Sequence, residues 1–133
     1  MTHPCYHAQT SVKRWGGEPA DYLPIHEWLD GSKVAFCDFR HRALRHHSFG
    51  VFEAEQLFGK TITNAAGRLV PVRYIAEQHI QEDCGGIVPT LADWLSRIPR
   101  EGWMSRGYSA EVADVLSGLK PKTASDAREP SHD

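Results

Sequence analysis

The sequence has few of the features that mark secreted or membrane proteins. It has three cysteines in 133 residues, in odd number and without a CxxC pair, which argues against a disulfide framework and favours reduced thiols. No run of 18 apolar residues occurs, and the opening MTHPCYHAQT lacks an apolar signal core. We therefore expect neither export nor a membrane span, and a cytoplasmic protein.

A strong charge of one sign is also absent. The chain has 15 Lys and Arg residues against 17 Asp and Glu residues, with a formal net charge of -2. No overall basic field is present to attract nucleic acid, so nucleic acid is not the favoured partner. A chain with 41% hydrophobic and 24% charged residues is typical of a globular protein, and its length suits one domain with a single core.

Glycine and proline divide the chain into predicted elements. We expect helices over about 4–15, within 20–30, over 33–58 with Gly50 at a bend, over 71–83, after Thr90 and over 109–118, with a hairpin turn at 64–67. The predicted fold is mainly α, a compact helical bundle-like domain over residues 1–118 with one small β-hairpin. Residues 119–133 have almost no apolar side chains and are predicted to be a disordered tail.

Histidine is abundant: there are eight, of which six lie between His7 and His79. Winding the predicted helices at about 100° per residue places His26, His47 and His79 within apolar faces. Three helices would then direct an imidazole to the same interior, where unpaired polar groups are costly. Asp83 follows His79 by one helical turn, a spacing that lets one helix supply two ligands.

The sequence therefore predicts a divalent metal ion, zinc, manganese, iron or nickel, bound by His26, His47, His79 and Asp83. The alternative is that these histidines form hydrogen bonds to Asp30, Asp83 and backbone carbonyls without a metal. The roles of four further polar residues, and the oligomeric state, are left open. These four residues are His7, Asp30, Asp38 and Arg40.

The segment DFRHRALRHHSFG, residues 38–50, adds three arginines beside its histidines. Arginine suits phosphate, and a metal-bound water is a nucleophile for phosphoester hydrolysis. We therefore expect a metal-dependent hydrolase of a small phosphorylated substrate, a phosphoester or nucleotide. In this hypothesis Lys33 and Arg45 orient the substrate anion, and His41 or His46 transfers a proton.

Two alternatives remain open. One is a non-enzymatic module in which a basic helix over 33–48 binds nucleic acid or a protein, with an affinity that falls steeply with salt. The other is a structural protein whose core histidines are simply hydrogen-bonded. Removing metal would then leave the melting temperature unchanged, whereas a bound metal contributes to stability.

Three segments resemble a family of small bacterial and phage proteins of unknown function. They are DYLPIHEWLDGSK, with the motif DYLPIHxW, DFRHRALRHHSFG, with the motif RHRALRHH, and VPVRYIAEQHIQEDCG; the resemblance spans about residues 6–104. It implies no particular chemistry. The order of His26, the pair His46-His47 and Asp83 is also similar to the ligand order of the HD-domain metal phosphohydrolases, which are all-helical. In that family the adjacent pair is His-Asp, whereas here it is His-His.

Overall fold

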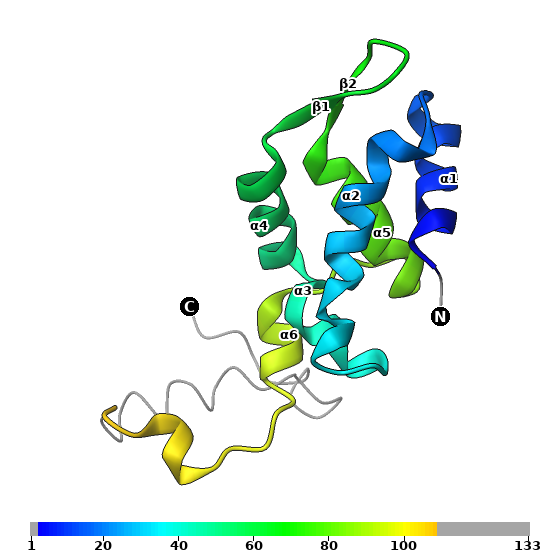
Figure 1. Ribbon diagram of the computed structural model, residues 1–133. Helices are drawn as coiled ribbons and strands as arrows, with labels where there is room; N and C mark the ends of the chain where they lie inside the picture. The colour runs from blue at the N-terminus through cyan, green and yellow to red at the C-terminus, as the bar shows by residue number, and fades with distance from the viewer. Residues whose placement is uncertain (1–2, 109–133) are drawn as a thin grey trace, which may run out of the picture. The chain divides into compact units, whose positions relative to one another are not determined.

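The computed structural model describes residues 3–108, and these are mainly helical with one small antiparallel hairpin, as the sequence predicts (Figure 1). The described residues fall into two compact units, which divide between Leu91 and Ala92. The predicted helix over 109–118 and the predicted tail lie outside the described residues. None of the helices in the described part of the chain combines the length and apolar character needed to cross a bilayer.

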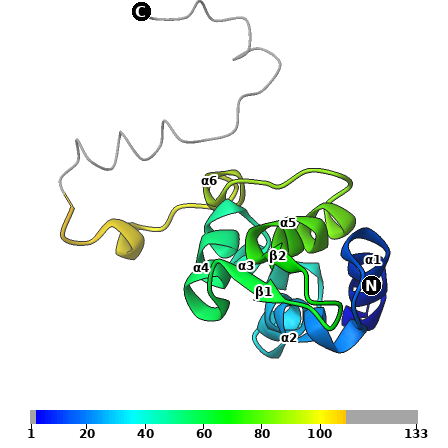
Figure 2. The ribbon, with the colours of Figure 1, turned by 90° about the horizontal axis from the view of Figure 1, so that it is seen from above.

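The elements follow one another in a simple order. They are α1 (Pro4–Trp15), α2 (Pro19–Asp30), the 3-10 turns η1 (Gly31–Val34) and η2 (Phe39–His41), α3 (Arg42–Arg45), α4 (Ser48–Phe58), β1 (Thr61–Thr63), β2 (Leu69–Pro71), α5 (Val72–Asp83), α6 (Leu91–Leu95) and η3 (Gly102–Ser105). Helix α5 is central to the first unit, because it packs against α1, α2 and α4 (Figure 2). Aliphatic residues of these helices and of β2, together with Tyr22 of α2, form the apolar core.

The hairpin directs the chain from α4 into α5. Its strands pair Thr61 with Pro71 and Thr63 with Leu69. The Asn64 side chain donates hydrogen bonds to the Trp15 carbonyl at 3.0 Å and to the Tyr22 hydroxyl oxygen at 3.1 Å. Since these two contacts reach α1 and α2, they hold the hairpin against the helices and place the start of α5.

The prediction of one long helix over 33–58 is wrong. The segment instead contains η1, η2, α3 and α4, so no continuous basic helix exists over 33–48. Side chains that accept hydrogen bonds from nearby backbone N–H groups begin new turns: Asp38 accepts from Arg40, and His47 accepts from Gly50 at 2.9 Å. Such local bonds compete with helix continuation. His47 is in the extended conformation, with φ -162° and ψ 171°, so the helical path stops before it and α4 starts anew.

Gly50 is required where α3 and α4 meet. A Cβ atom at this position would overlap the backbone carbonyl of Arg45. We therefore expect Gly50→Ala to lower the free energy of unfolding by about 3 kcal/mol, because the backbone must shift to make room. Denaturant unfolding measures this. Gly102→Ala is the control, since no atom lies within 4 Å of a Cβ there. An equal loss of unfolding free energy in the two variants would contradict the close approach of Gly50 to the Arg45 backbone.

Candidate metal centre

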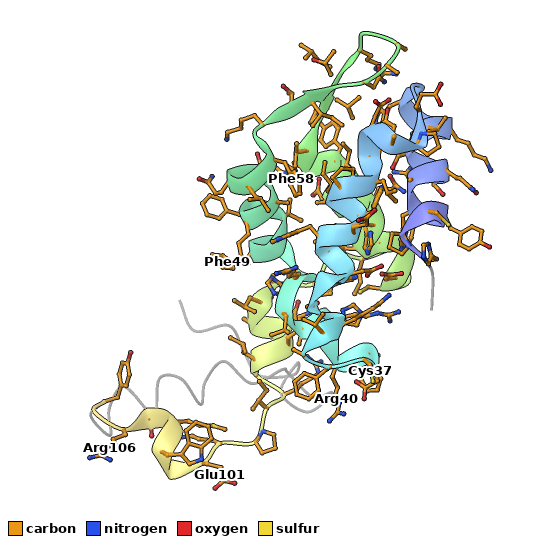
Figure 3. The ribbon with its side chains drawn as sticks, viewed as in Figure 1. Cys37, Arg40, Phe49, Phe58, Glu101 and Arg106 are labelled. Carbon is orange, nitrogen blue, oxygen red and sulfur yellow. The ribbon has the colours of Figure 1, made fainter. Side chains whose placement is uncertain are left out.

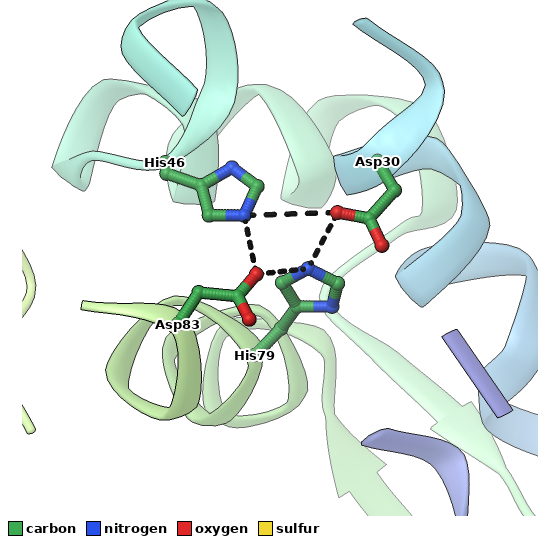
Figure 4. Close-up of side chains that lie close together, drawn as sticks. All are labelled: Asp30, His46, His79 and Asp83. Atoms are coloured by element: carbon green, nitrogen blue, oxygen red, sulfur yellow. Dashed lines mark hydrogen bonds and ion pairs between the residues drawn. The ribbon is translucent and has the colours of Figure 1, made fainter. Parts of the chain in front are cut away.

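Four side chains from three parts of the first unit bring donor atoms together in the interior (Figure 4). Asp30 is the last residue of α2, His46 follows α3, and His79 and Asp83 lie one turn apart on α5. One donor atom of each lies within 4.8 Å of all the others. We call Asp30, His46, His79 and Asp83 the four-residue cluster.

The cluster is a closed ring of short contacts. His46 Nε2 lies 2.9 Å from Asp83 Oδ2 and 3.8 Å from Asp30 Oδ1. His79 Nε2 lies 3.2 Å from Asp83 Oδ2 and 3.1 Å from Asp30 Oδ1. The side chains are almost completely buried, with at most 5% of any of them exposed.

These spacings suit a metal ion. Zinc binds histidine nitrogen and carboxylate oxygen at about 2.0–2.2 Å, and tetrahedral geometry then separates the donor atoms by roughly 3.4 Å. The four separations within the cluster, 2.9, 3.1, 3.2 and 3.8 Å, lie around that value. Two imidazoles and two carboxylates also form a suitable donor set for several divalent transition metals. The cluster therefore could hold one metal ion without a large rearrangement.

The charges within the cluster favour a cation. Burial raises the pKa of Asp83, but hydrogen bonds from His46, His7 and His79 outweigh this and hold it well below its usual range. Burial likewise acts against ionised Asp30, whose pKa is nevertheless lowered by the His79 hydrogen bond and the Lys33 charge. Both carboxylates are thus ionised at neutral pH. Burial lowers the pKa of His46, so its ring is neutral and able to act as a ligand.

A second layer of polar residues supports Asp83. His7, on α1, places Nδ1 2.7 Å from Glu82 Oε1 and Nε2 3.3 Å from Asp83 Oδ1. Burial opposes protonation of His7, yet its bonds to Asp83 and Glu82 raise the pKa above the ordinary histidine value. Its ring also stacks on His79, with centroids 3.8 Å apart. His7 therefore holds Asp83 through Oδ1, the carboxylate oxygen that His46 does not contact.

His26, a predicted ligand, lies next to the four-residue cluster and outside it. Its Nδ1 faces His79 Nδ1 at 3.0 Å, and its Nε2 contacts Ser11 Oγ at 2.8 Å. Burial, aided by the neighbouring His79 and His7 rings, lowers the pKa of His26 to about 2. Both ring nitrogens are therefore used in hydrogen bonds, and the ring is neutral.

His47, another predicted ligand, is also outside the cluster. Its Nδ1 accepts the Gly50 N–H as the N-cap of α4. Its ring lies beside Phe49, with centroids 6.4 Å apart, and Phe49 is half exposed on α4 (Figure 3). The break between α3 and α4 turns the two neighbouring histidines apart, so His46 reaches the cluster in place of His47.

The residues predicted to bind substrate or to transfer a proton lie in different surroundings. Lys33 Nζ lies 3.4 Å from Asp30 Oδ2, and 27% of its side chain is exposed. Arg45 instead donates to the Trp28 carbonyl and stacks over the Trp28 ring at 4.4 Å. His41 is fully buried beside His46, with ring centroids 5.3 Å apart. Burial, together with the neighbouring His46 ring, lowers the pKa of His41 to about 4.

The sequence leaves the role of Asp30 open and predicts a proton-transfer role for His46. Asp30 follows His26 by four residues, the same spacing that connects His79 to Asp83. That repeated spacing was a usable signal for Asp30. His46 had no such signal, because the local break that turns it inward depends on packing between α3 and α4.

The fold and the cluster define a small, mainly α-helical protein with a buried His/Asp group that could bind a metal. The chain belongs to the family described as a domain of unknown function (DUF6915), whose model matches residues 2–104. This agrees with the resemblance to a family of unknown function. A search of curated proteins found no match. A search of solved structures found none either.

Proposed function

We propose that the protein is a metal-dependent hydrolase of small phosphoesters, with one divalent metal ion held by the four-residue cluster. The observation that carries the proposal is the meeting of two imidazole nitrogens and two ionised carboxylates in one buried place. Burying two carboxylates close together is costly, and a cation between them offsets that cost. This ligand set replaces His26 and His47 of the sequence hypothesis with Asp30 and His46.

The choice of metal follows from the donors. Mixed nitrogen and oxygen ligands suit zinc, manganese, iron and nickel, the ions expected from the sequence. A metal that accepts more than four ligands keeps room for a water or a phosphate oxygen. Bound in this way, a divalent metal lowers the pKa of water toward neutrality, which is the chemistry that phosphoester hydrolysis needs.

Two further residues support the hydrolase proposal. The Lys33 ammonium group contacts the outer oxygen of Asp30 and is partly exposed, so it can attract an anionic substrate to this side of the cluster. His41 is the remaining candidate for proton transfer. Its Nδ1 contacts Ser32 Oγ at 3.0 Å, and its Nε2 has no hydrogen-bond partner among the described residues. Arg45 has a smaller part in the proposal, because Trp28 already engages it.

Elemental analysis of protein purified without a histidine tag tests the metal. We expect close to one equivalent of zinc, manganese, iron or nickel per chain, because the donors are already arranged for it. Less than about one-tenth of an equivalent, with no thermal shift on adding these metals, would remove the proposal.

Hydrolysis needs a separate test. The metal-loaded protein should hydrolyse a simple phosphomonoester, and Lys33→Gln should slow that reaction while keeping the metal content. Arg40→Gln is the matched control, since Arg40 is exposed and pairs with Asp38. Loaded protein that is inactive on phosphomonoesters, phosphodiesters and nucleotides would refute the hydrolase role and leave the metal site standing.

The alternative, a module that binds nucleic acid or protein through residues 33–48, has less support. Lys33 pairs with Asp30, Arg40 pairs with Asp38 at 2.8 Å, and Arg45 stacks on Trp28. The Arg40 hydrogen bonds hold the pKa of Asp38 at about 2, so this pair stays charged at neutral pH. Binding to duplex DNA that weakens steeply with salt, by protein that holds no metal, would favour this alternative.

A further inference from the structure

A chain of hydrogen bonds behind His79 begins at Gln78, and its direction follows from the partners. The Gln78 amide nitrogen lies 2.9 Å from the His7 carbonyl and 2.8 Å from Glu82 Oε1. Both partners only accept hydrogen bonds, so the Gln78 NH₂ group must face them. Gln78 Oε1 then faces Ser11 Oγ at 2.6 Å and must accept from it.

The hydrogen bonds of Ser11 then determine which atom donates between Ser11 and His26. Its hydroxyl group has one proton and lies near two oxygens that only accept, Gln78 Oε1 and the His7 carbonyl at 3.0 Å. The proton goes to one of them, so the third neighbour, His26 Nε2 at 2.8 Å, must donate to Ser11 Oγ. All three side chains are completely buried, which leaves no solvent to offer another arrangement.

The consequence reaches His79. A neutral His26 ring has one proton, and with that proton on Nε2 its Nδ1 can only accept. The facing atom, His79 Nδ1 at 3.0 Å, must therefore donate. His79 then has a proton on Nδ1, and its Nε2 atom faces Asp30 and Asp83, where a metal ion held by the two carboxylates would take up the Nε2 lone pair. This arrangement suits a metal ligand, because metal-binding histidines donate their other ring N–H to a fixed partner.

We propose that the buried relay Gln78, Ser11 and His26 sets the Nδ1–H form of His79 and so presents its Nε2 atom to the metal. This inference rests on the proposed metal site. His26 is then a positioning residue, which acts on the metal through His79. Each side chain of the relay thus has a fixed role as donor or acceptor. A buried histidine that only filled space in the core would not require such an ordered set of partners.

The relay can be tested without any substitution. Long-range ¹H–¹⁵N spectra of ¹⁵N-labelled protein distinguish the two neutral forms of each histidine. In metal-free and zinc-loaded protein we expect His26 with its proton on Nε2, and in zinc-loaded protein His79 with its proton on Nδ1. A His26 proton on Nδ1 in either sample would overturn the relay, even if zinc binds.

A pair of serine substitutions tests the effect on the metal. Ser11→Ala removes the acceptor of His26, so the His26 proton can move to Nδ1 and the His79 proton to Nε2. We expect zinc affinity, measured by competition with a chelator, to fall about 10- to 100-fold. Ser32→Ala is the matched control, because Ser32 is also buried and bonded to a histidine, His41, outside the relay. We expect its zinc affinity to change less than about threefold.

The results separate this inference from the proposed function. If Ser11→Ala is folded and binds zinc as the wild type does, the relay has no role in metal binding and the inference is wrong. If the wild-type protein binds no metal at all, both the proposed function and the purpose of the relay are overturned. Zinc binding that is weakened in Ser11→Ala alone, with the expected proton positions, supports both.

Discussion

Replacing Asp83 by asparagine is expected to abolish metal binding and to lower the free energy of unfolding of the metal-free protein by about 3 kcal/mol. Asp83 contacts three imidazoles, those of His7, His46 and His79. Asparagine has nearly the same shape but no charge, so the three buried rings lose the negative charge that they share. Breaking a buried ion pair on one side is costly because the other partners stay buried.

Asp38→Asn is the matched control for this prediction. Like Asp83, Asp38 is an ion-pair partner, but its side chain is 45% exposed. It is also the N-cap of η2, a position where asparagine serves equally well. We expect a change of less than about 0.5 kcal/mol and unaltered metal content. Urea unfolding and elemental analysis measure both quantities. If Asp83→Asn behaves as Asp38→Asn does, the buried charge network has no energetic role.

The adjacent histidines supply the second prediction. At a metal concentration of about 100 times the dissociation constant, binding to the native state adds about 2.7 kcal/mol of stability. For a domain of this size that corresponds to a rise in melting temperature of about 10 °C. His46→Asn should lose this rise, since it removes one donor of the four-residue cluster.

His47→Asn should keep the rise. His47 is equally buried and immediately adjacent, but its ring caps α4, and asparagine can replace it in that role. Thermal unfolding of both variants with and without zinc tests the difference. The reverse outcome, with His47→Asn losing the shift and His46→Asn keeping it, would support the ligand set expected from the sequence alone.

Helix ends were predictable where backbone chemistry determines them. Helix α1 starts at Pro4 and ends before Gly16, and α5 follows Pro71, as predicted. These residues act locally, through the fixed φ of proline and the freedom of glycine, so no knowledge of tertiary packing is needed. The hairpin was predictable for the same reason.

The segment over 33–58 was not predictable in this way. Its apolar residues fit the period of a single helix. That pattern alone does not reveal that the chain leaves the helical conformation between α3 and α4. The break depends on His47 acting as a cap and on the contact of Gly50 with the Arg45 backbone, which are tertiary features. The helical period over this segment therefore points to His47, whereas His46 lies in the four-residue cluster.

The part of the site on a single regular helix was more predictable. His79 and Asp83 lie on one face of α5, and the structure brings both into the cluster, as their spacing suggested. His26 was correctly expected in the interior, and its contacts place it behind His79. Which of several buried histidines contacts the carboxylates depends on distances of an ångström or two, and helical periodicity does not have that accuracy.

Anomalous diffraction from crystals of zinc-loaded protein tests the central claim most directly. We predict one anomalous peak per chain, within about 2.2 Å of His46 Nε2, His79 Nε2, Asp30 Oδ1 and Asp83 Oδ2. A peak bound instead by His26 or His47, or a cluster that stays metal-free while zinc binds elsewhere on the chain, would contradict the account.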